Sequence, residues 1–136
     1  AVKITGATAD YSVDEKINQT VSGGTAYGTV VSWTLDSGST TAGVLKYIQT
    51  NDAHTDGGVV RAFESNGSNA IGGESSTASG TVDTSYGSAL LGVTFASGLA
   101  APEIENNSGD LIYVENRRLI TRAPDQIEDI KLVIEF

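Results

Sequence analysis

The sequence contains no cysteine and no methionine, and it has only one histidine and two prolines. The lack of cysteine excludes disulfide cross-links, thiolate zinc sites and cysteine nucleophiles. No apolar run approaches the roughly 18 residues that a membrane-spanning helix needs. No stretch has the basic start and apolar middle of a secretory signal. We therefore expect a protein without a membrane partner.

Positive charge is also scarce. The 136 residues include 8 Lys and Arg against 17 Asp and Glu, which gives a formal net charge of −9. Binding to a phosphate backbone requires clustered Lys and Arg, so this balance argues against a nucleic-acid partner. Charged residues make up 18% of the chain, whereas about 25% is typical of globular domains.

Gly, Ser and Thr are abundant, and β-branched and aromatic residues occur in short runs between them. Residues 28–35 and 43–49 each favour a strand, and the turn-forming residues 36–42 predict a β-hairpin with a long loop between them. Residues 21–27 predict a turn that leads into the first of these strands. Residues 2–5 predict a short edge strand.

The rest of the pattern is weaker. Residues 58–63 predict a strand, and residues 65–80 predict either a long exposed loop or a pair of edge strands. Residues 88–95 predict a buried strand, which residues 96–102 break. The last stretch, residues 127–136, fits both helical spacing and strand alternation, and its β-branched residues favour a strand from about residue 129.

These elements predict a mainly β fold: an antiparallel β-sandwich or β-rich domain with long Gly/Ser/Thr loops and little helix. The length suits a single domain over residues 1–136. The alternative is a small β module over residues 1–50 followed by a C-terminal β portion over residues 51–136. The chain begins with Ala1 rather than Met, so we expect a processed product or a fragment of a longer protein.

His54 lies in the polar segment 52–57, where Asp and His alternate. This spacing is compatible with a metal site and is similar to the start of a calcium-binding loop. However, the twelfth position of such a loop is Phe63 rather than a bidentate Glu. We therefore interpret the segment as a solvated polar loop and predict no metal site.

No pattern selects a catalytic group. A serine nucleophile needs a base and an orienting group, and the sequence offers one His and no Gly-x-Ser-x-Gly elbow. Glu103 and Glu105 form a carboxylate pair of the kind that glycosidases use, but among 17 scattered acidic residues such a pair arises by chance. We predict no enzyme and no cofactor; a small hydrolase that uses His54 is the rival hypothesis.

The arginines are clustered. Three of the four lie between positions 117 and 122, and no Lys or Arg occurs from 62 to 116. One interpretation is local pairing with nearby carboxylates, and the other is a docking surface for carboxylates of another subunit. The residues expected at a C-terminal turn or a subunit interface are Tyr113, Asn116, Arg117, Arg118, Arg122, Asp125 and Gln126.

The C-terminal part of the chain carries an ordered pattern. It consists of Phe95, Gly98-Leu99-Ala100, Pro102-Glu103-Ile104, Ser108-Gly109-Asp110-Leu111-Ile112-Tyr113-Val114-Glu115-Asn116-Arg117, Ile120-Thr121-Arg122, Asp125-Gln126, Glu128-Asp129-Ile130-Lys131 and Ile134-Glu135-Phe136. This pattern resembles the end of the baseplate wedge protein of T4-like phages, the gene-eight product, especially in marine cyanophages. Residues 28–49 are similar to a β segment that recurs in phage structural proteins.

The resemblance implies a mainly β structural protein of the virion, a phage tail baseplate subunit that assembles with itself and with other wedge subunits in the host cytoplasm. It implies no enzyme activity. Members of that family are considerably longer, so the chain would be a C-terminal portion. Arg118 departs from the family pattern, in which Pro or Ala commonly follows Asn-Arg, and residues 51–90 do not align.

A different hypothesis is a carbohydrate- or receptor-binding β module of a tail fibre or a cell surface. Trp33, Tyr27 and Tyr47 would then form a stacking platform for the ligand. The competing interpretation of Trp33 is a core residue within a strand.

Overall fold

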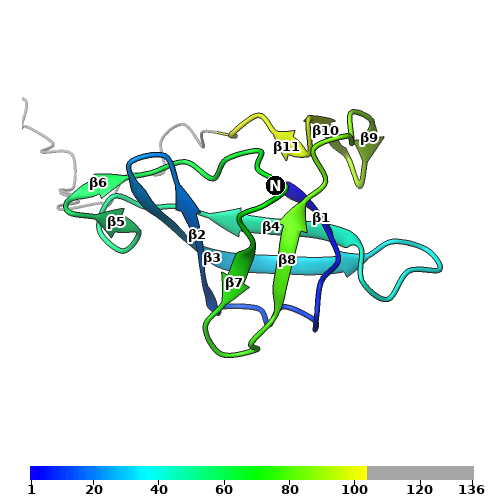
Figure 1. Ribbon diagram of the computed structural model, residues 1–136, viewed down its shortest axis with the longest axis horizontal. Coiled ribbons are helices and arrows are strands. Elements are labelled where there is room, and N and C mark those ends of the chain that lie inside the picture. Colours follow the sequence, from blue (N-terminus) through cyan, green and yellow to red (C-terminus); the bar gives the residue numbers. More distant parts are fainter. Residues whose placement is uncertain (104–136) are drawn as a thin grey trace, which may run out of the picture. The chain divides into compact units, whose positions relative to one another are not determined.

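The computed structural model describes residues 1–103, and the strand predicted from about residue 129 lies outside them. Within residues 1–103 the chain forms strands, turns and loops and contains no helix (Figure 1). Every strand pairing is antiparallel. The predicted mainly β, antiparallel fold is therefore confirmed.

The strands are β1 (Val2–Thr5), β2 (Lys16–Val21), β3 (Gly24–Leu35), β4 (Gly43–Ile48), β5 (Thr55–Asp56), β6 (Val59–Val60), β7 (Ile71–Gly73), β8 (Ser79–Val82), β9 (Ala89–Leu90), β10 (Val93–Ala96) and β11 (Leu99–Ala100). Strands β5 and β6 form a separate two-stranded hairpin.

Six strands close into a barrel in the order β4-β3-β2-β7-β8-β1, because β1 also pairs with β4. One edge of β1 pairs with β4, for example Lys3 with Val44. The other edge is shared, since Ile4 pairs with Val82 of β8 and Val2 pairs with Leu99 of β11. Strands β11, β10 and β9 therefore extend the sheet outward from the closing strand (Figure 1).

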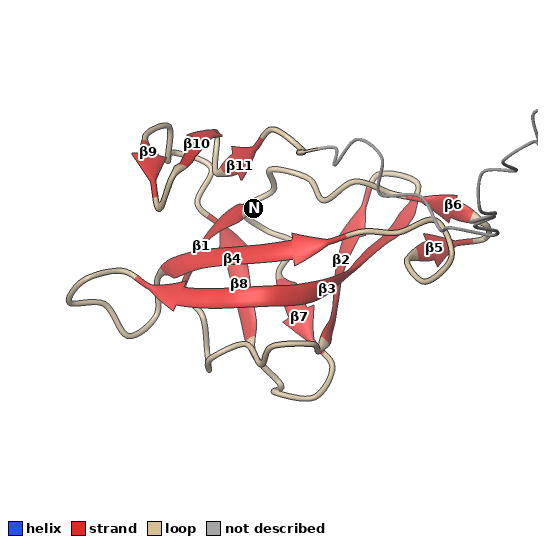
Figure 2. Cartoon of the chain, turned by 180° about the vertical axis from the view of Figure 1, so that it is seen from behind, coloured by secondary structure: helices blue, strands red, loops and turns tan. Residues whose placement is uncertain are grey.

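The long strand β3 pairs with two neighbouring strands. Its first half pairs with β2 and its second half with β4, and the register shifts between Val30 and Ser32. A β-bulge bends a strand and increases its twist, so this irregularity lets one strand turn the corner of a small barrel. Figure 2 shows β3 and β4 crossing the molecule as the two long strands. The hairpin predicted over residues 28–35 and 43–49 is confirmed.

Alternation along the strands places the core inside the barrel. Val2 and Ile4 of β1 point inward, and so do Ile17 of β2, Val30 of β3 and Leu45 of β4; all five are fully buried. Burying a side chain of this size contributes roughly 1.5–3 kcal/mol. The core is thus built from one or two residues of each of these strands, and not from one long apolar segment of the chain.

Three predictions about the first half of the barrel need correction. Residues 24–27, predicted as part of a turn, begin β3 because they pair with the unpredicted strand β2. The short strand at residues 2–5 is not an edge strand, because both of its edges are paired. Residues 65–80 are not an exposed loop or edge pair, because β7 lies between β2 and β8 and its Ile71 is fully buried.

Three further predictions need correction. Residues 88–95 do not form one buried strand, because a tight turn at Leu91 and Gly92 divides them into β9 and β10. Residues 96–102 continue the sheet extension, since Ala96 ends β10 and the chain returns as β11. The strand predicted over residues 58–63 is limited to Val59–Val60.

Gly80 of β8 tests how tightly the barrel is packed. A Cβ atom at this position would collide with the side chain of Ile4 and would approach the Ala7 Cα atom to 3.2 Å. We expect Gly80→Ala to lower the free energy of unfolding by about 1–3 kcal/mol, because a packed core resists an added methyl group. Urea unfolding followed by fluorescence measures this.

Gly87→Ala is the matched control, because a Cβ atom at Gly87 has no neighbour within 4 Å. Both substitutions restrict the unfolded chain in the same way. Equal unfolding free energies for the two variants would contradict tight packing around Gly80.

Candidate functional site

The seven residues predicted at a C-terminal turn or subunit interface lie outside the described residues. They are Tyr113, Asn116, Arg117, Arg118, Arg122, Asp125 and Gln126. The carboxylate pair is also split by this boundary, because Glu103 is described and exposed whereas Glu105 is not described.

His54 is buried, which corrects the prediction of a solvated side chain. The backbone N–H of Thr50 donates to Nδ1 at 2.9 Å, and Nε2 lies 2.8 Å from the hydroxyl of Thr29 on β3. Because Nδ1 accepts a hydrogen bond, the neutral ring carries its proton on Nε2 and donates it to Thr29. Burial lowers the pKa of His54, and the nearby positive charge of Lys16 lowers it further.

The carboxylate of Asp56, two residues from His54, has partners of its own. Asp56 accepts from the backbone N–H of Thr25 at 2.9 Å and from Arg61 Nε at 3.0 Å. Within residues 1–103, no group of three or more His, Asp and Glu side chains is placed to hold a metal ion. His54 and Asp56 instead attach the β4–β5 loop and the β5–β6 hairpin to β3.

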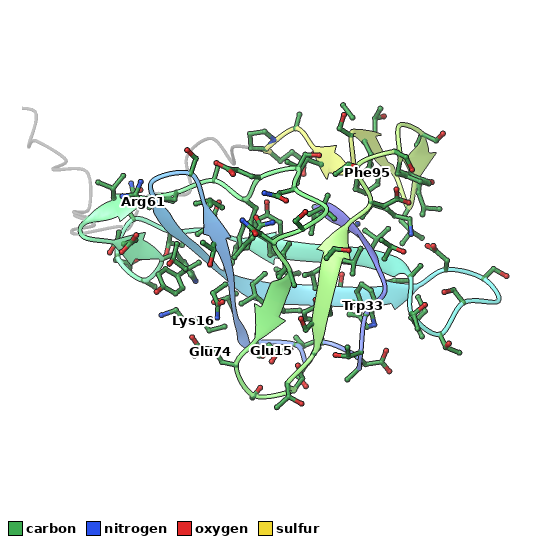
Figure 3. All side chains as sticks on the ribbon, viewed as in Figure 1. Glu15, Lys16, Trp33, Arg61, Glu74 and Phe95 are labelled. Carbon is green, nitrogen blue, oxygen red and sulfur yellow. The ribbon has the colours of Figure 1, made fainter. Side chains whose placement is uncertain are left out.

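Glu15 is a buried acid whose carboxylate accepts hydrogen bonds from two turns. Its carboxylate accepts from the backbone N–H of Ser12, and from the backbone N–H and hydroxyl of both Ser75 and Ser76, at 2.7–3.1 Å. Burial raises the pKa of Glu15, but these hydrogen bonds outweigh it, and the pKa lies below its ordinary value. Figure 3 shows Glu15 near Glu74, at the turn that the carboxylate holds.

Two of the three aromatic residues predicted as a stacking platform pack against the barrel core. The ring of Trp33 contacts Tyr11 edge-on at a centroid distance of 5.2 Å, and its indole N–H donates to Asp10 at 2.8 Å. Tyr47 contacts Phe63 edge-on at 4.6 Å. The core interpretation of Trp33 is therefore the one that its contacts favour.

Tyr27 lies on the other face of β3, because its neighbours Ala26 and Gly28 are the buried residues there. The Lys16 ammonium group lies 4.6 Å from the centre of its ring. The three rings therefore do not share one surface on which a sugar could stack.

A shallow, open depression lies in the described part between the end of β3 and the β9–β10 hairpin. It is an open groove of about 400 Å³ with a mainly apolar lining. One wall is formed by Leu35, Asp36 and Ser37, and the other by Tyr86, Leu90 and Leu91.

The second wall of the groove is firmly supported. The Tyr86 ring contacts the buried ring of Phe95 edge-on at 5.7 Å. The backbone of Tyr86 accepts from Gly98 N–H at 2.8 Å, and Phe95 N–H donates to Ser88 at 3.3 Å. Figure 3 shows Phe95 in the region of the β10 strand, at the opposite side of the view from Arg61.

A partly buried ion pair lies at the groove. Lys3 of β1 is only 3% exposed, and its ammonium group binds Oδ2 of Asp36 and lies 5.3 Å from the centre of the Tyr86 ring. A buried lysine without a carboxylate partner is strongly unfavourable. Lys3 therefore fixes Asp36, and with it the first wall, to the closing strand of the barrel.

Leu91 at the tip of the β9–β10 hairpin has an unusual conformation. Its φ is +52° and that of Gly92 is +78°, values typical of a type I′ turn, in which Asn, Asp or Gly is preferred at the first central position. A left-handed conformation costs an L-residue roughly 1–2 kcal/mol. The Leu91 side chain is nevertheless 48% exposed at the groove.

Sequence reasoning missed this groove because Leu90 and Leu91 were assigned to a buried strand. The available signal was the Leu91-Gly92 pair followed by Ser97-Gly98, since a residue before Gly within a β pattern marks a tight hairpin. Both pairs have positive φ at both positions. Nothing in the local pattern shows that Leu35 would lie opposite this hairpin.

The structure contains no helix long and apolar enough to span a membrane within the residues it describes. No protein-family model, no curated protein and no solved structure matches the chain.

The pH dependence of stability tests the neutral state of His54. Because the pKa of His54 is lowered in the fold, the unfolded chain binds the proton more readily below its ordinary pKa of about 6.5. We expect the free energy of unfolding of the native sequence to fall from pH 7 to pH 5.5, and that of His54→Gln to fall less. Urea unfolding at both pH values measures the difference.

The carboxyl groups with lowered pKa values, such as Glu15, affect stability only at more acidic pH. An identical pH dependence in the native sequence and in His54→Gln would show that His54 does not resist protonation in the fold.

The conformation of Leu91 predicts an unusual stabilisation. Asn tolerates a positive φ better than Leu does, so we expect Leu91→Asn to raise the free energy of unfolding by about 0.5–1 kcal/mol. Leu90→Asn is the control, because Leu90 lies in β9 and has no positive φ. A lower stability of Leu91→Asn would mean that Leu91 contributes to folding through its contacts.

Proposed function

We propose that this chain is a structural subunit of a phage tail baseplate and that it acts through protein–protein contacts. The observation that supports this proposal is the exposure of Leu91 at a backbone position that favours Gly or Asn. A Leu at this position destabilises the turn and also exposes apolar surface to water. A role outside folding is therefore the simplest physical explanation for it. A bound protein surface supplies such a role.

The surroundings of Leu91 fit the same role. Leu35 and Leu91 are exposed on the two walls, and Leu90 and Tyr86 complete an apolar surface. Exposed apolar patches with a polar rim are typical of interaction sites. The walls rest on the ion pair of Lys3 and on Phe95, so the surface is formed before a partner arrives.

The assignment to a baseplate wedge rests on the resemblance of residues 95–136. Six positions of that pattern lie in the described part, and two of them have evident structural roles. Phe95 supports the ring of Tyr86, and Gly98 has a φ of +78° in the turn before β11. The seven C-terminal residues named above are proposed as further subunit contacts.

Mass spectrometry of purified particles tests this proposal. Particles from the source are banded on a density gradient, treated with nuclease and digested. We expect peptides of this sequence in a fixed ratio to the other tail proteins, and on a parent chain much longer than 14.1 kDa. An abundant host protein, followed through the same gradient, is the control for contamination.

Two results would contradict the baseplate assignment. One is the absence of these peptides from particles in which other tail proteins are detected. The other is their recovery at the level of the host contaminant or on a free chain of 14.1 kDa.

A further inference from the structure

Asn66 and Gly67 lie together in the loop between β6 and β7. They form the only Asn-Gly pair in the 136-residue sequence. Gly67 is exposed and Asn66 is half-buried. Because Gly has no side chain, little hinders the backbone nitrogen of Gly67 from approaching the side-chain amide carbon of Asn66. A bond between these two atoms closes a succinimide ring, so the pair contains the groups for a reaction within the chain.

The backbone activates the amide group that would be attacked. Oδ1 of Asn66 accepts from the backbone N–H of Ser68 at 2.8 Å and from that of Asn69 at 3.2 Å. Negative charge develops on this oxygen when a nucleophile attacks the amide carbon, and fixed N–H donors aimed at such an oxygen stabilise the transition state. Because both neighbours are donors, the atom that faces them is the oxygen. The amide nitrogen, which has to leave, is the other atom.

The segment that supplies these donors is anchored on both sides. Gln19 of β2 is fully buried, and its amide group donates to the C=O of Glu64 at 3.1 Å and to that of Asn69 at 3.0 Å. The Asn69 side chain donates to the C=O of Thr20 at 2.8 Å. The turn at Asn66 is therefore fixed to β2, and its N–H donors are in position before any reaction begins.

The attacking group is accessible as well. The Gly67 N–H donates to no backbone carbonyl among the described residues. No backbone hydrogen bond of that part of the chain therefore has to break before this nitrogen attacks.

The Asp56-Gly57 pair is chemically related but not equivalent. The carboxylate of Asp56 accepts from the Thr25 N–H and from Arg61, and these hydrogen bonds lower the pKa of Asp56. An ionised carboxylate is a poor electrophile. A Gly in the next position is therefore not sufficient, and the neutral amide of Asn66 is the group that can react.

We propose that Asn66 is a self-modification site, at which the folded chain deamidates through Gly67. The Gly67 nitrogen forms a bond to the side-chain carbon of Asn66 and loses its proton. The bond from this carbon to Nδ2 breaks, and Nδ2 leaves with that proton as ammonia. Water then opens the succinimide at either carbonyl carbon and leaves Asp or isoaspartate. Both products add a negative charge, and isoaspartate also lengthens the main chain between the two carbonyl groups that Gln19 binds.

Peptide mapping tests the proposal. The full 136-residue chain is incubated at pH 8 and then digested at mildly acidic pH, which suppresses the reaction during handling. Chromatography with mass spectrometry separates the Asn, Asp and isoaspartate forms. We expect Asn66 to convert at least tenfold faster than Asn51 and Asn69, neither of which precedes a Gly. A synthetic peptide of residues 61–71 is the unfolded reference, and we expect the native chain to react at least as fast as this peptide.

Gly67→Ala separates the chemistry from the fold. A Cβ atom at Gly67 would lie 3.8 Å from its nearest neighbour, Cγ2 of Thr84, and Gly67 has no positive φ. We therefore expect this variant to fold and to deamidate at least tenfold more slowly, because the added methyl group hinders the attack. Gly87→Ala is the matched control, since a Cβ atom there has no neighbour within 4 Å, and it should react like the native sequence. Circular dichroism verifies that both variants are folded.

Three outcomes would overturn the proposal. Asn66 could convert no faster than Asn51 and Asn69, or Gly67→Ala could react as fast as the native sequence. The native chain could also react more slowly than the peptide, which would show that the fold protects Asn66. None of these outcomes depends on the composition of particles, so the modification site and the baseplate assignment are tested separately.

Discussion

The closing of the barrel by β1 is the constraint on which the other features depend. Four residues saturate both strand edges, with β4 on one side and with β8 and β11 on the other. Val2 and Ile4 enter the core, while Lys3 binds Asp36 at the groove. One short strand therefore closes the barrel, starts the sheet extension and fixes a wall of the groove, because its two edges pair with three strands while its two faces contact the core and Asp36.

Buried polar side chains hold the long loops that a small core does not cover. Gln19 bonds the backbone of Glu64 and Asn69, Glu15 bonds the turn at Ser75 and Ser76, and His54 bonds Thr29 and Thr50 on separate segments. Within residues 1–103 no buried side-chain polar atom lacks a hydrogen-bond partner. Because buried polar groups are costly without partners, these networks define one loop arrangement in a chain rich in Gly, Ser and Thr.

Two turns of similar conformation in the sheet extension differ in their first residue, and the comparison shows which side chain the turn requires. Leu91-Gly92 and Ser97-Gly98 have nearly the same backbone angles. The small polar Ser at one turn and the exposed Leu at the other show that the backbone conformation does not demand an apolar side chain. Leu91 lines the same groove as Leu35, Asp36 and Tyr86, and its exposure there is the feature that folding leaves unexplained.

The sequence alone determined the β class and the hairpin of residues 28–35 and 43–49, because β-branched runs and turn residues act locally. The tertiary structure decided the rest. It turned the Gly- and Ser-rich segments at residues 71–73 and 79–82 into strands inside a closed barrel, buried His54 and exposed Leu91 at the groove. The alternation of apolar and polar residues shows which segments favour an extended backbone. Which of their side chains become buried depends on which distant strand pairs with each edge. That pairing is set by the loops that bring distant strands together, and not by the local sequence.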